Sequence, residues 1–176
     1  MGAGRNSPCS IEQLNLAGSQ LPGEGLKQVI RTLPDCASLT ALNLSEHPEL
    51  GQNLVLLRIL GRLIAQHPSL RHLGLADTGL TAANAREFFA HMAAQPGLLE
   101  GLDLSGNSEL AGCIAPSSSG GAATGSLVGY LRQSRDLRRL VLRRCGLMPS
   151  TLEALSSGFL PPAASGPRSL LQELDV

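Results

Sequence analysis

The sequence predicts an α/β solenoid, in which strand–turn–helix units stack along one axis and share a continuous core. Two observations predict this fold class. The frame Leu-x-x-Leu-x-Leu begins at positions 11, 39, 70, 99, 137 and 171, with Ile11 for the first leucine of the first copy and Val176 for the last leucine of the sixth. Aromatic residues make up only 2% of the chain, so leucine must fill most of the core, as it can when each unit packs only on its neighbours.

The end of each frame predicts a short strand with one buried side. In the copy LEGLDLSGN (99–107), Leu102 and Leu104 alternate with Gly101, Asp103 and Ser105. Side chains along a strand point alternately to opposite faces. We therefore expect the leucines in the core and the intervening residues on the concave face of a parallel sheet.

A residue that can form hydrogen bonds follows each strand. The ninth position of the frame holds Ser19, His47, Thr78, Asn107 and Cys145. The turn at this point leaves backbone groups buried between repeats, and a side chain that donates and accepts can satisfy them. We predict that these side chains form a column that joins neighbouring repeats. At His47 the ring bonds a carbonyl or the loop bulges.

The apolar spacing after each strand predicts a helix that covers the convex face. The predicted helices span 25–33, 54–67, 81–94, 126–134 and 148–159. Pro34, Pro68 and Pro96 end the first three. Two segments rich in Ser, Gly, Ala and Pro, 113–126 and 160–169, are predicted to be flexible insertions because they can bury little apolar surface.

These elements define one repeat domain over residues 9–176, with about five and a half repeats. The last frame stops inside its strand at Val176, so we expect a domain that is incomplete at its C-terminal end. The N-terminal segment lacks the apolar core of a secretory signal, and no stretch is apolar for long enough to predict a membrane span. Four cysteines (Cys9, Cys36, Cys113 and Cys145) lack metal-binding spacing, which predicts reduced thiols and an intracellular location, in the nucleus or cytoplasm.

The repeats resemble the leucine-rich repeat superfamily. Their length of about 28–29 residues and the full helix in each unit are similar to the ribonuclease-inhibitor-like subclass. The resemblance implies a module that binds other proteins. The extensions PEL and SEL after His47 and Asn107 resemble Tonsoku-like repair scaffolds and NOD-like receptors. The resemblance to Tonsoku-like scaffolds implies that the chain is part of a larger intracellular, nuclear scaffold in DNA replication or repair. The resemblance to NOD-like receptors implies the ligand-sensing, autoinhibitory repeats of an innate immune receptor. A purely structural brace is the third alternative.

Sequence motifs of catalysis are missing. The four histidines form no HExxH pair, and the chain contains no GxSxG elbow, no phosphate loop and no GxGxxG after a strand. His67, which precedes Pro68 at the end of a predicted helix, is interpreted as a cap. We therefore expect no enzyme activity, no cofactor, no metal and no small-molecule substrate.

Basic residues gather around the fifth repeat, where RQSRDLRRLVLRR (132–144) holds six of the fourteen lysines and arginines. Such a patch attracts an acidic protein surface. Nucleic acid is not expected, because no aromatic residue lies among the arginines to stack on bases. The alternative is a solvated rim in which Arg138 and Arg139 pair with Glu173 and Asp175. Six residues of the concave face and its edge are predicted to contact a partner: Arg139, Arg143, Arg144, Asp103, His72 and Asp175.

Overall fold

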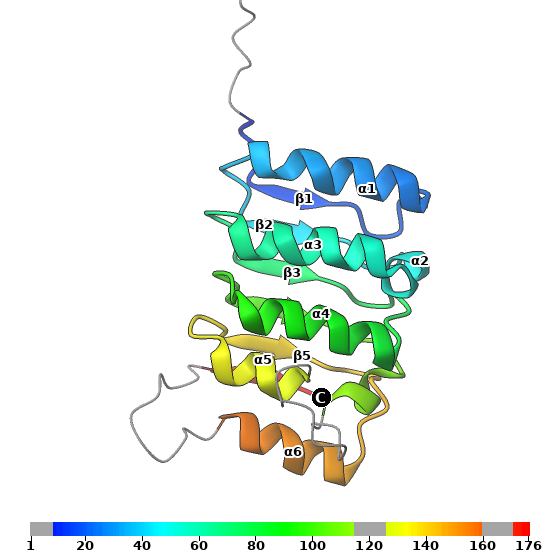
Figure 1. Ribbon diagram of the computed structural model, residues 1–176, viewed down its shortest axis with the longest axis vertical. Coiled ribbons are helices and arrows are strands. Elements are labelled where there is room, and N and C mark those ends of the chain that lie inside the picture. Colours follow the sequence, from blue (N-terminus) through cyan, green and yellow to red (C-terminus); the bar gives the residue numbers. More distant parts are fainter. Residues whose placement is uncertain (1–8, 115–125, 160–170) are drawn as a thin grey trace, which may run out of the picture.

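The strands form one parallel sheet in chain order. The computed structural model describes residues 9–114, 126–159 and 171–176, and the side chains of all of these except 157–159. Its six strands pair consecutively (Figure 1) and are β1 (Gln13–Asn15), β2 (Ala41–Asn43), β3 (His72–Gly74), β4 (Gly101–Asp103), β5 (Arg139–Val141) and β6 (Glu173–Asp175). The predicted α/β solenoid with a parallel sheet is confirmed.

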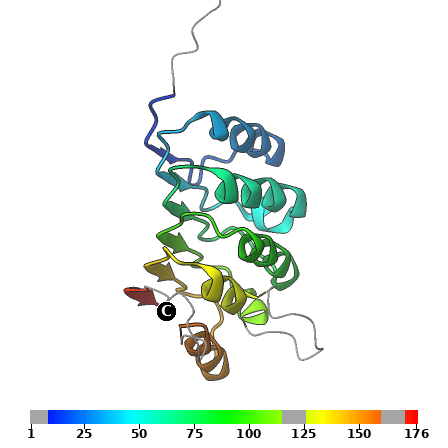
Figure 2. The ribbon, with the colours of Figure 1, turned by 60° about the vertical axis from the view of Figure 1, so that its left-hand side comes forward.

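Helices cover the opposite face, as Figure 2 shows from the side. The five long helices are α1 (Gly23–Thr32), α3 (Leu54–Gln66), α4 (Ala82–Ala94), α5 (Leu127–Gln133) and α6 (Pro149–Phe159). Each lies close to its predicted range, because apolar side chains at helical spacing bury one face. Three short elements were not predicted: the 3-10 turns η1 (Leu33–Asp35) and η2 (Leu110–Cys113) and the helix α2 (Pro48–Gln52).

The core is a ladder of leucines. Parallel register aligns the central residue of every strand, and Leu42, Leu73, Leu102 and Leu140 are at most 2% exposed. Burial of each such side chain stabilises the fold by about 1.5–3 kcal/mol on transfer scales. At the edge of the sheet the same position, Leu174, is 40% exposed because none of the described strands pairs with the outer side of β6.

The column of polar side chains is present, and Asn107 makes the largest number of bonds in it. Its amide nitrogen donates to the carbonyls of Leu75 (2.9 Å) and Leu104 (2.8 Å), and its amide oxygen accepts from the N–H of Leu80 (2.9 Å) and the hydroxyl of Thr78 (3.2 Å). One side chain therefore satisfies backbone groups of two repeats. This confirms the predicted role of an amide at the ninth position of the frame.

The other members of the column do part of the same work. The ring of His47 bonds the carbonyls of Leu44 (3.2 Å) and Ser45 (3.0 Å) through Nδ1 and the hydroxyl of Ser19 (3.1 Å) through Nε2. The short helix α2 begins at the next residue, Pro48. Cys145 donates from Sγ to the carbonyl of Leu104 (3.2 Å). Of the two alternatives predicted for His47, the bond to a carbonyl is confirmed.

His67 acts as the predicted cap. Its buried ring accepts the N–H of Leu70 at Nδ1 (3.1 Å), and its Nε2 lies 3.2 Å from the carbonyl oxygen of Cys36. Because Nδ1 accepts, Nε2 carries the proton and donates to that carbonyl. The histidine therefore joins the end of α3 to the preceding repeat.

One prediction about the cysteines is wrong. Cys9 and Cys36 form a disulfide, with 4.8 Å between their Cα atoms. Their separation of 27 residues is close to one repeat, so the stacking of repeats places them at about the spacing of adjacent strands. Cys113 and Cys145 are free and buried. The intracellular location, which was predicted partly from four reduced thiols, loses that support and stays a prediction.

The predicted flexible insertions, 113–126 and 160–169, lie mostly outside the described residues. At the ends of the first, Cys113 at the end of η2 and Ile114 after it are fully buried, and the hydroxyl of Ser126 accepts the N–H of Gly129 (3.0 Å) to cap α5. These three terminal residues therefore pack as part of the repeat, and the flexibility of the insertions stays a prediction.

Within the described ranges, none of the helices combines the length and the apolar character that crossing a membrane requires.

Candidate functional site: the concave groove

The concave face of the sheet holds a groove of about 570 Å³ that runs across β1 to β5. Parallel register arranges its outward residues in two rows across the strands. The first row is Gln13, Ala41, His72, Gly101 and Arg139, and the second is Asn15, Asn43, Gly74, Asp103 and Val141. The side chains of this face are therefore uncharged over β1 to β3, and charged side chains appear from β4 onward.

Side-chain oxygens of the second row shape the turn after the strand. In three repeats such an oxygen accepts the N–H two residues later: Asn15 from Ala17 (3.0 Å), Asn43 from Ser45 (3.1 Å) and Asp103 from Ser105 (2.9 Å). This is the usual local bond of asparagine and aspartate in turns. An amide and a carboxylate serve the turn equally, so the negative charge of Asp103 is not required by it.

Two glycines keep the floor of the groove low. A Cβ atom at Gly74 would stand 2.5 Å from Oδ1 of Asn43, and one at Gly101 would stand 2.7 Å from Nδ1 of His72. Both distances are too short for a real contact. The side chains of Asn43 and His72 therefore lie across the neighbouring strand, over the glycine, and a larger residue at either position would require that side chain to move.

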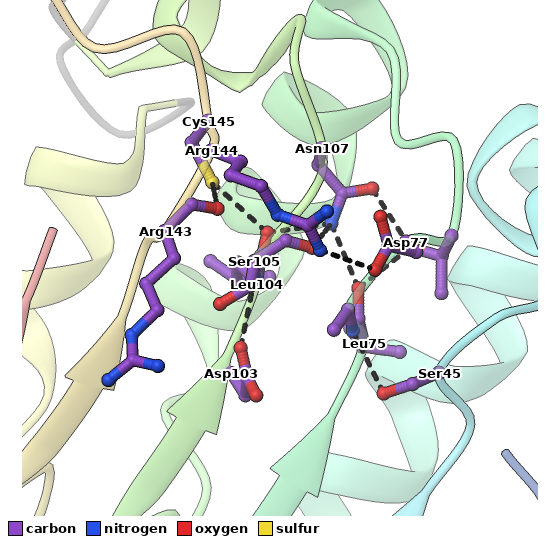
Figure 3. Close-up of polar contacts among 12 residues, drawn as sticks. Ser45, Leu75, Asp77, Asp103, Leu104, Ser105, Asn107, Arg143, Arg144 and Cys145 are labelled. Atoms are coloured by element: carbon purple, nitrogen blue, oxygen red, sulfur yellow. Dashed lines mark hydrogen bonds and ion pairs between the residues drawn. The ribbon is translucent and has the colours of Figure 1, made fainter.

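The three arginines predicted to bind a partner are all engaged in ion pairs. Nε of Arg139 lies 3.3 Å from Glu173, and Nε of Arg143 donates to Asp175 at 2.7 Å. Nη2 of Arg144 lies 3.2 Å from Oδ2 of Asp77 (Figure 3). The alternative predicted for this region, a rim of paired charges, is therefore correct for Arg139 and Glu173. It is wrong about Asp175, which pairs with Arg143 rather than with Arg138 or Arg139.

The pair between Arg144 and Asp77 spans an intervening repeat. Both residues and Gly106 between them occupy the eighth position of the frame and have left-handed backbones, with φ of 55°, 51° and 73°. A Cβ atom at Gly106 would collide with the carboxylate of Asp77. The absence of a side chain at Gly106 thus lets two residues 67 positions apart meet across it.

The pair between Arg143 and Asp175 alters the acidity of both groups. The hydrogen bond from the guanidinium lowers the pKa of Asp175 below its ordinary value, and the same bond raises the pKa of Arg143. Both groups therefore stay charged and paired at neutral pH. Arg143 is bound to a neighbouring strand of its own sheet, which reduces what it can offer to a partner.

The remaining predicted site residues, His72 and Asp103, both line the groove. His72 is exposed, and Asp103 is half-buried and has no ion pair with any described residue. Among the described residues, no three His, Cys, Asp or Glu side chains are grouped to hold a metal ion. Asp77 and Asn43, which were not among the predicted contact residues, also belong to this region. Aligning the eighth position of each frame would have placed Asp77 in one line with Arg144.

Comparison with known proteins finds similarity among solved structures. No protein-family model matches the chain, and no curated protein matches it. Among solved structures, the chain is similar to the leucine-rich repeat-containing protein LegL7 from Legionella pneumophila, with 19% sequence identity and a TM-score of 0.52. The match covers 96% of this chain and 48% of the other, so this chain spans about half the length of that protein. At this identity the similarity shows the leucine-rich repeat fold alone.

Proposed function

We propose that the chain is a protein–protein interaction module and that its partner docks in the concave groove. The observation that carries the proposal is the groove itself, which has a volume of about 570 Å³, crosses five strands and lies above the two glycines at 74 and 101. Concave surfaces of solenoids offer extended binding faces on a rigid frame. A brace between domains would not need side chains such as His72 and Asn43 to lie flat and leave this surface open, which favours binding over a purely structural role.

The parent protein that we propose is a larger intracellular scaffold, located in the nucleus and linked to DNA replication or repair. The support is the resemblance of the irregular repeats, with their extensions after His47 and Asn107, to Tonsoku-like scaffolds. Ligand-sensing repeats of a NOD-like receptor are the alternative, because the same extensions resemble that class. The flanking sequence distinguishes the two, since a nucleotide-binding domain accompanies the receptor and further repeat domains accompany the scaffold.

An acidic partner surface, predicted from the arginines of the fifth repeat, stays part of this proposal only in weakened form. Arg139, Arg143 and Arg144 each have a carboxylate within their own sheet or its edge. Exposed pairs of this kind exchange partners at little cost, so an acidic protein could still compete for them. It would have to displace three internal carboxylates to do so.

The test places the same bulky charge on opposite faces of the molecule. Ala41→Arg puts a guanidinium into the groove, and Ala83→Arg puts it on the exposed side of α4. Immobilised wild-type and variant proteins are compared for the proteins that they retain from cell extract, and one retained protein is then purified for affinity measurement. We expect Ala41→Arg to weaken binding roughly tenfold or more, since a clash at the centre of an interface exceeds about 1.4 kcal/mol. Equal binding by both variants would refute the proposal.

A further inference from the structure

The charges on the groove and its C-terminal edge do not cancel. Three arginines and four carboxylates gather there: Arg139, Arg143, Arg144, Asp77, Asp103, Glu173 and Asp175. Three pairs account for six of these groups. The carboxylate that is left over belongs to Asp103, so this end of the groove carries one net negative charge rather than the positive charge that its arginines suggest.

The turn that Asp103 caps does not require its charge, which forms no described ion pair and contributes to the raised pKa of Arg143. The one described hydrogen bond of Asp103, from the N–H of Ser105, is made by an uncharged amide at the equivalent positions Asn15 and Asn43. A half-buried carboxylate loses part of its hydration, and a cation nearby would compensate for that loss. None of the described cationic side chains forms an ion pair with it.

The surroundings of Asp103 suit a hydrogen-bond donor that enters from the groove. Gly74 is its register neighbour on β3, and over this glycine lie Oδ1 of Asn43 and, slightly farther away, Oγ of Ser45. A carboxylate thus stands on one side of a residue that has no side chain, and an amide oxygen stands over it from the other side. Oxygen atoms of this kind accept several N–H donors at once, as an ammonium or a guanidinium group provides them.

We propose that the groove receives a lysine or arginine side chain of its protein partner, which pairs with the carboxylate of Asp103 above Gly74. This inference rests on the proposed function and names the chemistry of the partner at that site. The three arginines then act within the protein rather than on the partner, because each neutralises a carboxylate that would otherwise compete with Asp103 for the incoming cation. The sign of the charge on the partner is opposite to the one that the arginine-rich sequence predicts.

The test uses two fluorescein-labelled peptides, hexalysine and hexaglutamate, and measures their binding to the full chain by fluorescence anisotropy at low salt. The decisive variant is Asp103→Asn, which keeps the oxygen that Ser105 requires and removes the charge. Asp35→Asn makes the same change at an exposed residue outside the groove. Thermal unfolding of both variants should match that of the wild-type protein.

We expect Asp103→Asn to weaken hexalysine binding roughly two- to fivefold, the range for a partly exposed ion pair. Asp35→Asn should leave the binding unchanged. Equal binding of hexalysine to all three proteins would overturn the inference. So would tighter binding of hexaglutamate that is lost in Arg143→Gln, because the groove would then select an acidic partner. In either case, loss of partner binding in Ala41→Arg would still uphold the proposed function, so the two proposals can fail separately.

Discussion

The first pair of repeats and the central pair have the same fold but are joined by different chemistry. At the first two repeats, a disulfide links Cys9, just before the first frame, to Cys36, just before the second, and the hydroxyl of Ser19 bonds the ring of His47. Between repeats three and four, Asn107 makes the link through buried hydrogen bonds to Leu75 and Leu80. Neighbouring repeats are thus linked in both regions, but the link can be a disulfide with a hydrogen bond between side chains or a set of hydrogen bonds from an amide to the backbone.

The two kinds of connection differ in what they satisfy. The ring of His47 bonds carbonyls of its own turn through one nitrogen and a side chain of the preceding repeat through the other. The amide of Asn107 bonds backbone groups on both sides, including the carbonyl of Leu104 in its own repeat. Because unsatisfied buried backbone groups are costly, the centre should depend on Asn107 more than the first pair depends on any one hydrogen bond.

The largest expected effect is that of Asn107→Leu. The substitution keeps the approximate volume but leaves the N–H of Leu80 without its partner. It also removes one bond to each of the carbonyls of Leu75 and Leu104, which keep only their described bonds from Thr78 and Cys145. A buried group left unsatisfied costs about 1–3 kcal/mol, and each lost hydrogen bond costs about 1 kcal/mol. We therefore expect the free energy of unfolding to fall by about 4 kcal/mol, measured by urea denaturation followed by circular dichroism.

The control for this variant is Asn15→Leu, which makes the same change at an exposed position. Water can replace the bond that Asn15 accepts from Ala17, so the loss should stay below about 1 kcal/mol. Hydrogen exchange should place the faster exchange of Asn107→Leu in repeats three and four. A similar loss in both variants would mean that the column contributes no more than a surface turn.

The next effect concerns the first pair of repeats. Closing a loop of 27 residues by a disulfide stabilises a fold by about 3.5 kcal/mol in the chain-entropy account. The double variant Cys9→Ser/Cys36→Ser should therefore lower stability by up to that amount. Because repeats contact only their neighbours, we expect faster hydrogen exchange in the first repeat and little change around Asn107.

A count of reactive thiols tests whether Cys9 and Cys36 form the disulfide in solution. The unreduced protein, unfolded in denaturant, should show two reactive thiols, and four after reduction. In the folded protein these two should react slowly, since burial raises the pKa of Cys113 to about 12 and that of Cys145 to about 11, and the thiolate is the reactive form. Four reactive thiols without reduction would remove the disulfide and restore the prediction of reduced cysteines.

The repeat pattern contains enough information to predict the fold, the core and the column. A frame that aligns Leu42, Leu73 and Leu102 also aligns their strands, so the sheet order and the register follow from the spacing alone. The helices follow for the same reason, since apolar residues at helical spacing must face the leucines. Contacts between adjacent repeats, such as that of Arg139 with Glu173, could be predicted from this frame.

Contacts that depend on conformation beyond the frame could not be predicted. The pair between Asp77 and Arg144 needs two left-handed residues and a glycine between them, and sequence spacing does not reveal backbone angles. The disulfide joins residues that occupy slightly different positions of the frame, so an alignment of repeats does not place Cys9 opposite Cys36. The pairing of the remaining arginines could not be predicted for a related reason, because counting arginines does not show which carboxylates they reach.

The smallest effect should come from the exposed pair on the last two strands, in contrast to the buried links of the centre. Arg143→Gln removes the guanidinium that lowers the pKa of Asp175, so that pKa, followed by NMR titration of the side-chain carboxyl, should rise toward its ordinary value. A depressed carboxyl pKa stabilises the fold above the ordinary pKa of aspartate, and the stabilisation is lost as the pH falls through the depressed value. The variant should therefore be slightly less stable than the wild-type protein at neutral pH, and the difference should disappear as the pH falls through the depressed pKa. An unchanged pKa of Asp175 in Arg143→Gln would show that the pair does not persist in solution, and Arg143 would then be available to a partner after all.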